Sequence, residues 1–373
     1  MNPVETLKRF VSRAFSESYG FVSWFAPGND EIKSILQNKT NVTGINTMEI
    51  ENQSGFIFAP FVPGIKNKTL LIRPDMVFRG YQEMANYSGG YRKEDIKLSD
   101  KKDDGYNPAS KEEFLRAVSS IINKIGQGEA EKVVYSRTLV QEMDFETSHP
   151  AILLMEMHKR YPHAFCYLFF TPETGFWLGA SPELLLEKKA KKYRTMALAG
   201  TREKSGEPKM NKNWPRKDVD EQAFVSKYIE DTLIDLQVSN YKRSDPYTFA
   251  AGNVEHLRSD FEFPVESLSG RMAEFIRVLH PTPAICGKPK AKALQLIREY
   301  EKYDRTYYCG FLGPLNIQDE THFFVNLRCM KLQKHAAILF VGGGITKDSE
   351  PEAEWNETKL KAETLLSVIR EKY

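Results

Sequence analysis

One segment of the sequence places two carboxylates on what its periodicity predicts to be the buried side of a helix. The helix is expected at about residues 217–238. Its apolar stripe consists of Val225, Tyr228, Ile229, Thr232 and Leu236. Continued backwards at helical spacing, the stripe reaches Glu221 and Asp218, which are three residues apart and therefore share one face.

The last helix, expected from near Pro351, repeats this arrangement. Its inner side, read backwards, consists of Val368, Leu365, Lys361, Glu357 and Glu354. Acidic residues also favour the first turn of a helix, where the helix dipole stabilises them, and this explanation is open for either helix alone. Two helices that bury carboxylates favour a ligand, because an unpaired buried carboxylate is costly. Mg²⁺ fits, since it takes one or two protein carboxylates and leaves positions for water and substrate.

Two further residues are suited to moving protons. Lys132 stands at the start of the run KVVYSRTLV, either as a solvated edge residue or as a general base in a pocket. Glu183 follows Ser181-Pro182 and the run GFWLGA, either as a turn carboxylate or as a general acid kept protonated in a partly dry site. If one pocket contains both, the pair predicts acid–base catalysis.

Other residues suggest a site for an anion. The glycines at 342–344 end a predicted strand before the last helix, so their N–H groups are candidates for anion binding. They match neither common nucleotide-binding fingerprint. Arg328, in the predicted strand FFVNLRCMKL, suits a carboxylate if it faces a pocket and is otherwise a surface residue. His256 and His280 lack zinc-ligand spacing.

The elements that must position these residues follow from local patterns. Ser110-Lys-Glu-Glu113 is a capping box that opens a helix, which Gly126 and Gly128 can end. Further helices are expected at 151–161 and about 290–302. Strands are predicted in FCYLFF, GFWLGA, SPELLLEKK, YRTMALAGT, YYCGFLGPLN and AILFVGGG.

The first 95 residues contain short apolar runs, such as SGFIFAPFV and TLLIRPDMVF, which are expected as strands of a mixed sheet. Polar stretches at 97–107 and 203–215 are expected to be connections. Strands and helices do not alternate regularly along the chain. The pattern therefore favours an α+β fold with large antiparallel sheets.

Composition excludes several classes of function. The 373 residues include 52 basic and 50 acidic side chains, so a strong basic excess typical of nucleic-acid binders is absent. The run EKKAKKYR at 187–194 is expected to be a solvated hairpin. Apolar runs fall short of the roughly 20 residues that span a bilayer. The four cysteines form no C-x-x-C pair, which predicts buried reduced thiols in a cytoplasmic protein.

Nine ordered segments resemble the signature of the chorismate-utilising enzymes, which include isochorismate, salicylate, anthranilate and aminodeoxychorismate synthases. They are KVVYSR, LGASPELLL, LAGTRE, KDVDEQAFV, LHPTPAICG, DRTYYCGFLGPLN, VNLRCMKL, FVGGGI and EWNETKLKAETLL. The resemblance implies one large α+β domain over 1–373, with stacked antiparallel sheets and outer helices. Residues 1–105 are its divergent part and 110–370 the family core.

The resemblance also implies roles for individual residues. Glu221 and Glu357 would hold an Mg²⁺ that binds a carboxylate of chorismate, with Asp218 and Glu354 close by. Substrate contacts are implied for Gly200, Thr201, His256, Ala284, Tyr308, Arg328, Gly342, Gly343 and Lys361.

Within this family, two positions help to select the reaction. Lys132 stands where isochorismate and salicylate synthases have a water-activating lysine and ammonia-using members typically have glutamine. Ala199 stands where aminodeoxychorismate synthases typically have a nucleophilic lysine. The implied reaction is conversion of chorismate to isochorismate: Lys132 takes a proton from water that adds at C2, and Glu183 protonates the hydroxyl that leaves C4.

Alternatives follow from the same comparison. A salicylate synthase would go on to eliminate pyruvate, but LHPTPAICG, with Ala284, resembles the isochorismate synthases more closely. A non-catalytic chorismate-binding homologue would lack Lys132, Glu183 or a metal ligand. The family's usual histidine after the metal-binding glutamate is Gln222 here. This departure puts the fine tuning of the activity in doubt, rather than the activity itself. A monomer without a glutaminase subunit is the expectation, and both menaquinone and siderophore synthesis are open as pathways.

Overall fold

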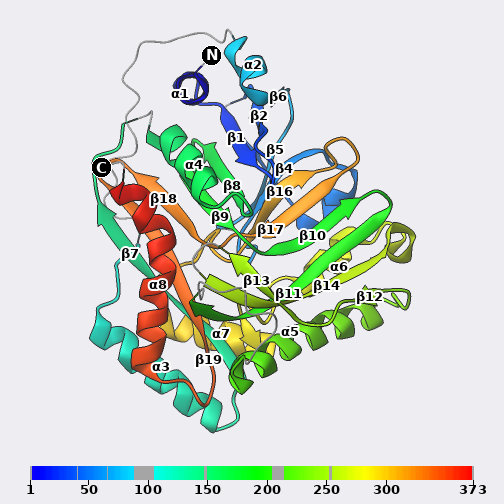
Figure 1. The fold of residues 1–373 in the computed structure, drawn as a ribbon, viewed down its shortest axis with the longest axis vertical. Coiled ribbons are helices and arrows are strands. Elements are labelled where there is room, and N and C mark those ends of the chain that lie inside the picture. Colours follow the sequence, from blue (N-terminus) through cyan, green and yellow to red (C-terminus); the bar gives the residue numbers. More distant parts are fainter. Residues whose placement is uncertain are drawn as a thin grey trace.

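The computed structural model describes residues 2–39, 41–64, 66–87, 105–146, 149–203, 214–251 and 254–371. Its strands form two large sheets (Figure 1). The first sheet has the strand order β15-β7-β19-β18-β9-β8-β1-β2-β6. Its strands are β1 (Gly20–Phe25), β2 (Ile32–Gln37), β6 (Met76–Arg79), β7 (Lys132–Glu142), β8 (Phe165–Thr171), β9 (Gly175–Ser181), β15 (Gly287–Lys288), β18 (Cys329–Gln333) and β19 (Ala336–Ile345).

The second sheet has the order β12-β14-β11-β10-β17-β16-β4-β5-β3, and β13 pairs with β14 beside this path. Its strands are β3 (Thr43–Ile45), β4 (Gly55–Ala59), β5 (Thr69–Ile72), β10 (Leu184–Lys189), β11 (Lys192–Glu203), β12 (Lys242–Arg243), β13 (Tyr247–Ala251), β14 (Val254–Pro264), β16 (Phe311–Leu315) and β17 (Thr321–Val325). The strand pairings among the described residues are antiparallel in both sheets, so the expectation of a mixed sheet near the N-terminus is wrong.

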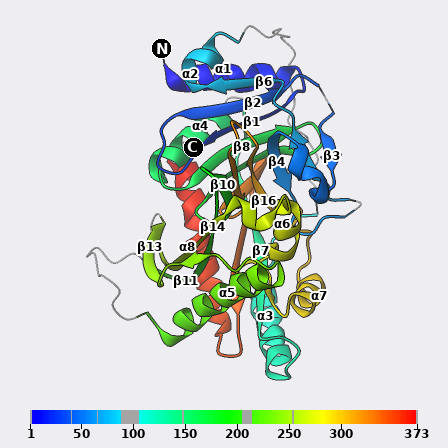
Figure 2. The same ribbon diagram turned by 90° about the vertical axis from the view of Figure 1, so that its right-hand side faces the viewer.

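Helices cover the outer faces of the two sheets (Figures 1 and 2). They are α1 (Pro3–Ser16), α2 (Gly80–Ala85), α3 (Lys111–Gly126), α4 (His149–Arg160), α5 (Arg216–Asp235), α6 (Met272–Leu279), α7 (Lys290–Tyr300) and α8 (Pro351–Arg370), with 3₁₀ turns η1 (Thr47–Asn52) and η2 (Val265–Leu268). The capping box of Ser110 and Glu113 opens α3 as predicted. No helix in the described ranges is long and apolar enough to cross a membrane.

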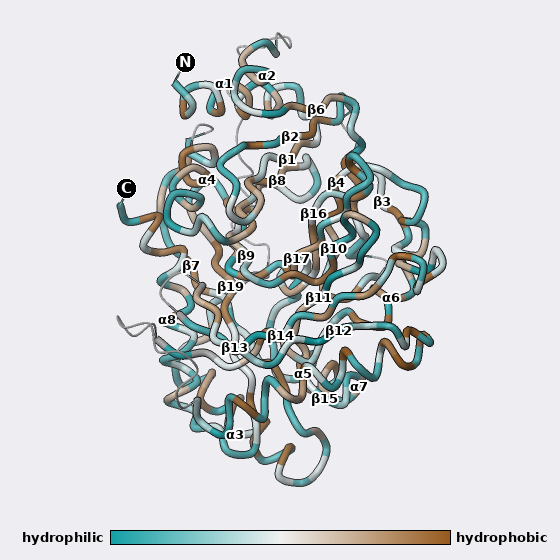
Figure 3. The backbone as a smooth tube through the Cα atoms, turned by 45° about the vertical axis from the view of Figure 1, so that its right-hand side comes forward, coloured by the Kyte–Doolittle hydropathy of each residue, from teal (hydrophilic) through white to brown (hydrophobic). Residues whose placement is uncertain are grey.

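Strand β8 explains why some runs are apolar at every position. Phe165, Tyr167 and Phe169 point into the core between the two sheets. The intervening Cys166, Leu168 and Phe170 point to a second core beneath α1, α4 and α8. Because successive side chains of a strand face opposite sides, a strand that is covered on both sides must be apolar throughout. Figure 3 shows hydrophobic stretches on strands of both sheets and on the helices that cover them.

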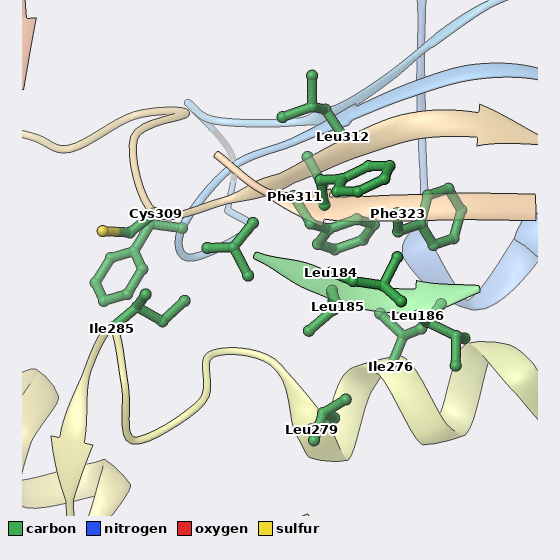
Figure 4. Packing of buried hydrophobic residues seen from close by; sticks show 14 of the residues in the cluster. Leu184, Leu185, Leu186, Ile276, Leu279, Ile285, Cys309, Phe311, Leu312 and Phe323 are labelled. Atoms are coloured by element: carbon green, nitrogen blue, oxygen red, sulfur yellow. The ribbon is translucent and has the colours of Figure 1, made fainter. Parts of the chain in front are cut away.

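The core between the sheets holds them together through aromatic and aliphatic contacts. The ring of Phe58 in β4 stacks on that of Phe169 in β8, with centroids 4.2 Å apart. Figure 4 shows Ile276 and Leu279 of α6 beneath the leucines of β10, with β16 and β17 above. The four cysteines are buried and free, as the sequence predicts.

Several sequence-based expectations fall partly outside the described residues. Of the expected polar connections at 97–107 and 203–215, residues 97–104 and 204–213 are not described. The predicted hairpin at 187–194 is confirmed as the pairing of β10 with β11. Ala190 and Lys191 at its turn have φ values of +47° and +64°, which suits a tight hairpin between antiparallel strands.

Candidate active site

A cavity opens where the ends of both sheets meet the first turns of α5 and the middle of α8. Its lining is Val134, Phe340, Gly342, Gly343 and Gly344 from the first sheet; Leu198, Ala199, Gly200 and His256 from the second; Lys217, Asp218, Glu221, Glu357 and Lys361 from the helices; and Pro182, Glu183, Ala284, Ile285, Tyr308, Cys309, Leu327 and Arg328 from connections. Most of the residues predicted for the site therefore surround one cavity.

Helix α5 directs Glu221 into the cavity. The buried residues Val225, Ile229 and Thr232 fix the inner face of the helix, as the predicted stripe requires. One oxygen of Glu221 pairs with Nζ of Lys132, and the other accepts the N–H of Gly200 at 3.3 Å. Burial alone would raise the pKa of Glu221, but neighbouring lysines, above all Lys132, hold that pKa below its ordinary value.

Helix α8 contributes two carboxyl groups whose pKa values are shifted in opposite directions. The side chain of Glu354 is 3% exposed, and its Oε1 accepts hydrogen bonds from Ser349 Oγ at 2.6 Å and Lys217 Nζ at 3.3 Å. Burial, and then the charge of Glu357, raise the pKa of Glu354. The carboxylate of Glu357 pairs with Lys361 Nζ at 2.5 Å, and this lysine outweighs the effect of burial and lowers the pKa of Glu357.

The glycines of β19 make room for these side chains. A Cβ atom on Gly343 would lie 3.0 Å from Glu354 Oε2, and one on Gly344 would lie 2.6 Å from Lys132 Cε and 3.1 Å from Glu221 Oε1. A side chain at either position would displace the acidic groups. The glycine run, which the sequence suggested as a backbone anion site, thus also provides space beside the carboxylates.

The residues fit a hard divalent cation. Oxygen donors from two helices converge beside β19, and Glu354 Oε2 is buried without a hydrogen-bond partner among the described residues. Such an orphaned carboxylate oxygen is costly unless a cation compensates it. Within the described ranges no three acidic, histidine or cysteine side chains form a ready-made cluster. Mg²⁺ needs only one or two protein carboxylates, so this does not conflict with the prediction.

Lys132 is 4% exposed at the first position of β7, so the interpretation as a solvated edge lysine is wrong. It is covered because β15 pairs alongside it, with Lys288 opposite Lys132. Its ammonium group reaches Glu221 beside the cavity. Lys132 and Glu354 stand directly behind the lining rather than in it.

Glu183 lies in the connection between β9 and β10, with its backbone tied to Val325 and Ser181. The residue is 5% exposed, and burial raises its pKa to about 8. The charges of Lys132 and Arg328 counteract part of this rise. A carboxyl group with such a pKa is mostly protonated at neutral pH, as a general acid must be.

The position of Arg328 differs from the sequence expectation. The run FFVNLRCMKL is not one strand: β17 ends at Val325 in the second sheet and β18 begins at Cys329 in the first. Arg328 occupies the bend between them with a φ of +48°. This bend directs the residue to the cavity, where its guanidinium forms no hydrogen bond or ion pair within the described residues. A cation of this kind is available to bind an anionic ligand.

Other predicted contact residues also lie at the cavity. Tyr308 is buried there with its ring on Phe340, at a centroid distance of 5.4 Å. His256 Nδ1 and the carbonyl oxygen of Gly200 are 2.8 Å apart, and Lys361 Nζ donates to the carbonyl of Gly342 at 3.0 Å. The side chain of Thr201 lies outside the described part of the chain.

Sequence reasoning missed Lys217, and it considered Gln222 only because it follows the proposed metal ligand Glu221. Lys217 lines the cavity and pairs with Glu354; its spacing of four residues from Glu221 was the available signal. Gln222 points away from the cavity. Its Nε2 donates to the hydroxyls of Ser226 at 3.0 Å and Ser259 at 2.9 Å, so it joins α5 to β14.

The fold places the chain in a class of solved structures. It matches "MenF, the Menaquinone-Specific Isochorismate Synthase from Escherichia Coli" with a TM-score of 0.75, 20% identity, and coverage of 96% of this chain and 90% of that one. A putative 2,3-dihydroxybenzoate-specific isochorismate synthase from Bacillus anthracis gives a TM-score of 0.74 at 20% identity, with coverage of 97% and 99%. The class is an antiparallel sandwich with outer helices, as predicted.

The sequence then identifies the family. The profile of the chorismate binding enzymes matches residues 77–370, and the chain belongs to this family. The vibriobactin-specific isochorismate synthase of Vibrio cholerae is 27% identical over 363 residues, which cover 96% of this chain and 87% of that protein. Isochorismate synthase EntC of Escherichia coli K12 is 29% identical over 247 residues, covering 65% of this chain and 63% of EntC. The resemblance to chorismate-utilising enzymes, and to isochorismate synthases in particular, is confirmed.

Proposed function

We propose that this protein is an isochorismate synthase, an isomerase that converts chorismate to isochorismate with Mg²⁺. The family and its similarity to isochorismate synthases support the activity. The observation that carries the assignment is the combination of Lys132, buried beside the cavity, with Glu183, whose raised pKa suits a proton donor. Ala199 in the lining leaves no nucleophilic lysine for the aminodeoxychorismate reaction.

Substrate binding is assigned to the positive groups that face the cavity. Arg328 is the partner for one carboxylate of chorismate, since its guanidinium offers a planar fork of N–H donors. The buried hydroxyl of Tyr308 is a further donor. We assign Mg²⁺ to Glu221 and Glu357, with Asp218 and Glu354 nearby; when bound, it attracts a substrate carboxylate electrostatically.

The reaction requires one base and one acid. Lys132, in its neutral form, takes a proton from water while the oxygen adds to C2 of the ring. The two ring double bonds shift, and the bond from C4 to its hydroxyl breaks. Glu183 donates a proton to the departing oxygen, which leaves as water. One water is consumed and one is released, so the net change is an isomerisation.

The pairing of Lys132 with Glu221 bears on this mechanism. In the structure the carboxylate of Glu221 is the immediate partner of Lys132 Nζ, the atom that must accept the proton from water. A role as base therefore requires Glu221 to be engaged elsewhere. Its proposed role in holding Mg²⁺ meets this requirement. Because water is the nucleophile, we also propose that the protein needs no glutaminase subunit. We further propose that it is a monomer, as the sequence analysis expects.

The test is product analysis by chromatography and mass spectrometry after incubation with chorismate. We expect isochorismate with Mg²⁺, none with a chelator, and a loss of at least about 100-fold in Lys132→Ala, because general base catalysis contributes about 10²–10⁴-fold. Lys189→Ala is a matched control, since this lysine pairs with Glu320 on the surface. Salicylate with pyruvate would assign the chain to salicylate synthases instead. Anthranilate formed from added ammonia would contradict water attack, and no turnover would favour a binding-only homologue.

A further inference from the structure

Glu301 and Arg305 form a buried ion pair behind the cavity wall. Glu301 follows the last residue of α7, and both side chains are 2% exposed. Arg305 binds the carboxylate with two parallel hydrogen bonds, from Nε at 2.8 Å and from Nη2 at 2.6 Å. This two-pronged geometry fixes the orientation of both side chains.

The other hydrogen bonds of the pair connect it to two further segments of the chain. Arg305 Nη2 also donates to the carbonyl of Val134 at 2.6 Å, and Nη1 donates to the carbonyl of Ile285 at 2.9 Å. Glu301 Oε1 accepts from both the N–H of Ser136, at 2.8 Å, and its hydroxyl, at 2.6 Å. One ion pair therefore holds β7 and the connection before β15 in a fixed relation.

Each of these contacts lies directly behind the reacting residues. Val134 and Ile285 line the cavity, and Val134 is two positions after Lys132 on the same strand. The carbonyl of Arg305 accepts the N–H of Tyr308 at 2.8 Å, which sets the turn that places Tyr308 in the wall. The proposed base and a proposed substrate contact thus share one anchor.

Stability alone gives a weak reason for this arrangement. Burying two charges costs desolvation energy, and apolar residues of similar volume commonly serve a core as well or better. What apolar residues do not provide is directional hydrogen bonds to chosen carbonyls. We propose that Glu301 and Arg305 are positioning residues of the active site, which hold β7 and the Tyr308 turn in the register that the reaction needs. This inference rests on the proposed function.

The experiment compares Arg305→Met and Glu301→Gln with Phe10→Leu, a substitution on the face of α1 that packs into the second core. We expect kcat to fall about 10- to 100-fold in both pair variants, with a smaller change in KM, because small misplacements of catalytic groups cost this much. Arg305→Lys should recover little, since lysine lacks the planar fork. Phe10→Leu should lower the melting temperature while kcat stays unchanged.

Amide hydrogen exchange provides a readout that needs no activity. In Glu301→Gln, which keeps the size of the side chain, the amides of Val134 and Ser136 should exchange faster while those of α4 do not change. The inference is overturned if exchange in β7 equals that of the wild type, or if kcat is unchanged. If the wild-type protein makes no isochorismate, the proposed function fails, and the exchange rates still decide whether the pair orders the cavity wall.

Discussion

At the scale of single residues, Glu183 combines a cost in stability with its proposed function. Its pKa of about 8 in the folded protein exceeds the ordinary value of 4.5 because burial disfavours the carboxylate. Between these values the unfolded chain releases a proton that the folded chain keeps. Stability from this group is therefore complete below about pH 4.5 and is lost as the pH rises towards 8. Groups that serve activity commonly lower the stability of the folded protein in this way.

Replacement of Glu183 by glutamine should separate these two effects. Glu183→Gln removes the proton donor, so activity should fall by about 10²–10⁴-fold. It also removes the buried ionisable group, so the melting temperature at pH 8 should rise and depend less on pH. Activity assays and thermal denaturation between pH 5 and pH 9 check both. A variant that is inactive and also less stable at pH 8 would contradict the account of burial.

The pH dependence of the wild-type enzyme follows from the same group. The proposed acid must be protonated to donate, so kcat should decline as the pH rises through about 8, the pKa that burial gives to Glu183. Steady-state rates measured from pH 6 to pH 10 test this expectation. Because the wild-type profile reports every essential group, a decline that begins below pH 7 would mean that another residue controls it.

At the scale of elements, strand β19 is part of the sheet and also leaves space for side chains of the proposed active site. Its residues from Ala337 to Val341 are packed on both faces, whereas Gly343 and Gly344 leave room for Lys132 and two carboxylates. The strand remains paired with β7 throughout this stretch, so the space costs no backbone hydrogen bonds. The rigid ladder and the open cavity are thus properties of one element.

Adding one methyl group to this strand should disturb function more than folding. In Gly344→Ala the new Cβ would lie 2.6 Å from Lys132 Cε, which is near the end of a flexible side chain and can move aside. We expect kcat to fall by about 100-fold with only a small change in melting temperature. Gly126→Ala, where a Cβ would meet no atom within 4 Å, is the matched control. Equal activity of both variants would show that the position of Lys132 is not critical.

Sequence patterns predicted some elements well and others poorly, for physical reasons. Helices α5 and α8 bury one face, so their period was readable and led to Glu221 and Glu357. The capping box of α3 is a local signal and was equally clear. The bend at Arg328 was missed because β17 and β18 are both apolar, and nothing local says that the chain changes sheets between them. The role of Lys217 depends on α8, far away in sequence.

At the scale of the whole molecule, residues before the matched family segment are integral to both sheets. Strands β1 and β2 extend the first sheet beyond β8, and β3, β4 and β5 complete the second beyond β16. Helix α1 covers the second core with Leu7, Phe10 and Val11. We therefore propose that residues 1–373 form one domain, whose divergent first part is structural.

Deletion of residues 1–45 should abolish folding. It removes α1 and β1–β3 and uncovers the second core. It also leaves β8, then paired only with β9, as an apolar edge strand, which promotes aggregation. Circular dichroism and size-exclusion chromatography of the shortened chain test this expectation. A monomeric, cooperatively folded product that still binds chorismate would show that the first part is dispensable.

The bend at Arg328 is one covalent passage from one sheet to the other at the edge of the cavity, and the connection from β9 to β10 that carries Glu183 is another. Sliding of the two sheets would therefore displace Arg328 and Glu183, two residues that we assign to the reaction. Chorismate bound between Arg328 and the proposed metal site of α5 and α8 would then link elements that pack on both sheets. In mechanical terms, we expect the bound substrate to brace the two sheets against each other until the product leaves.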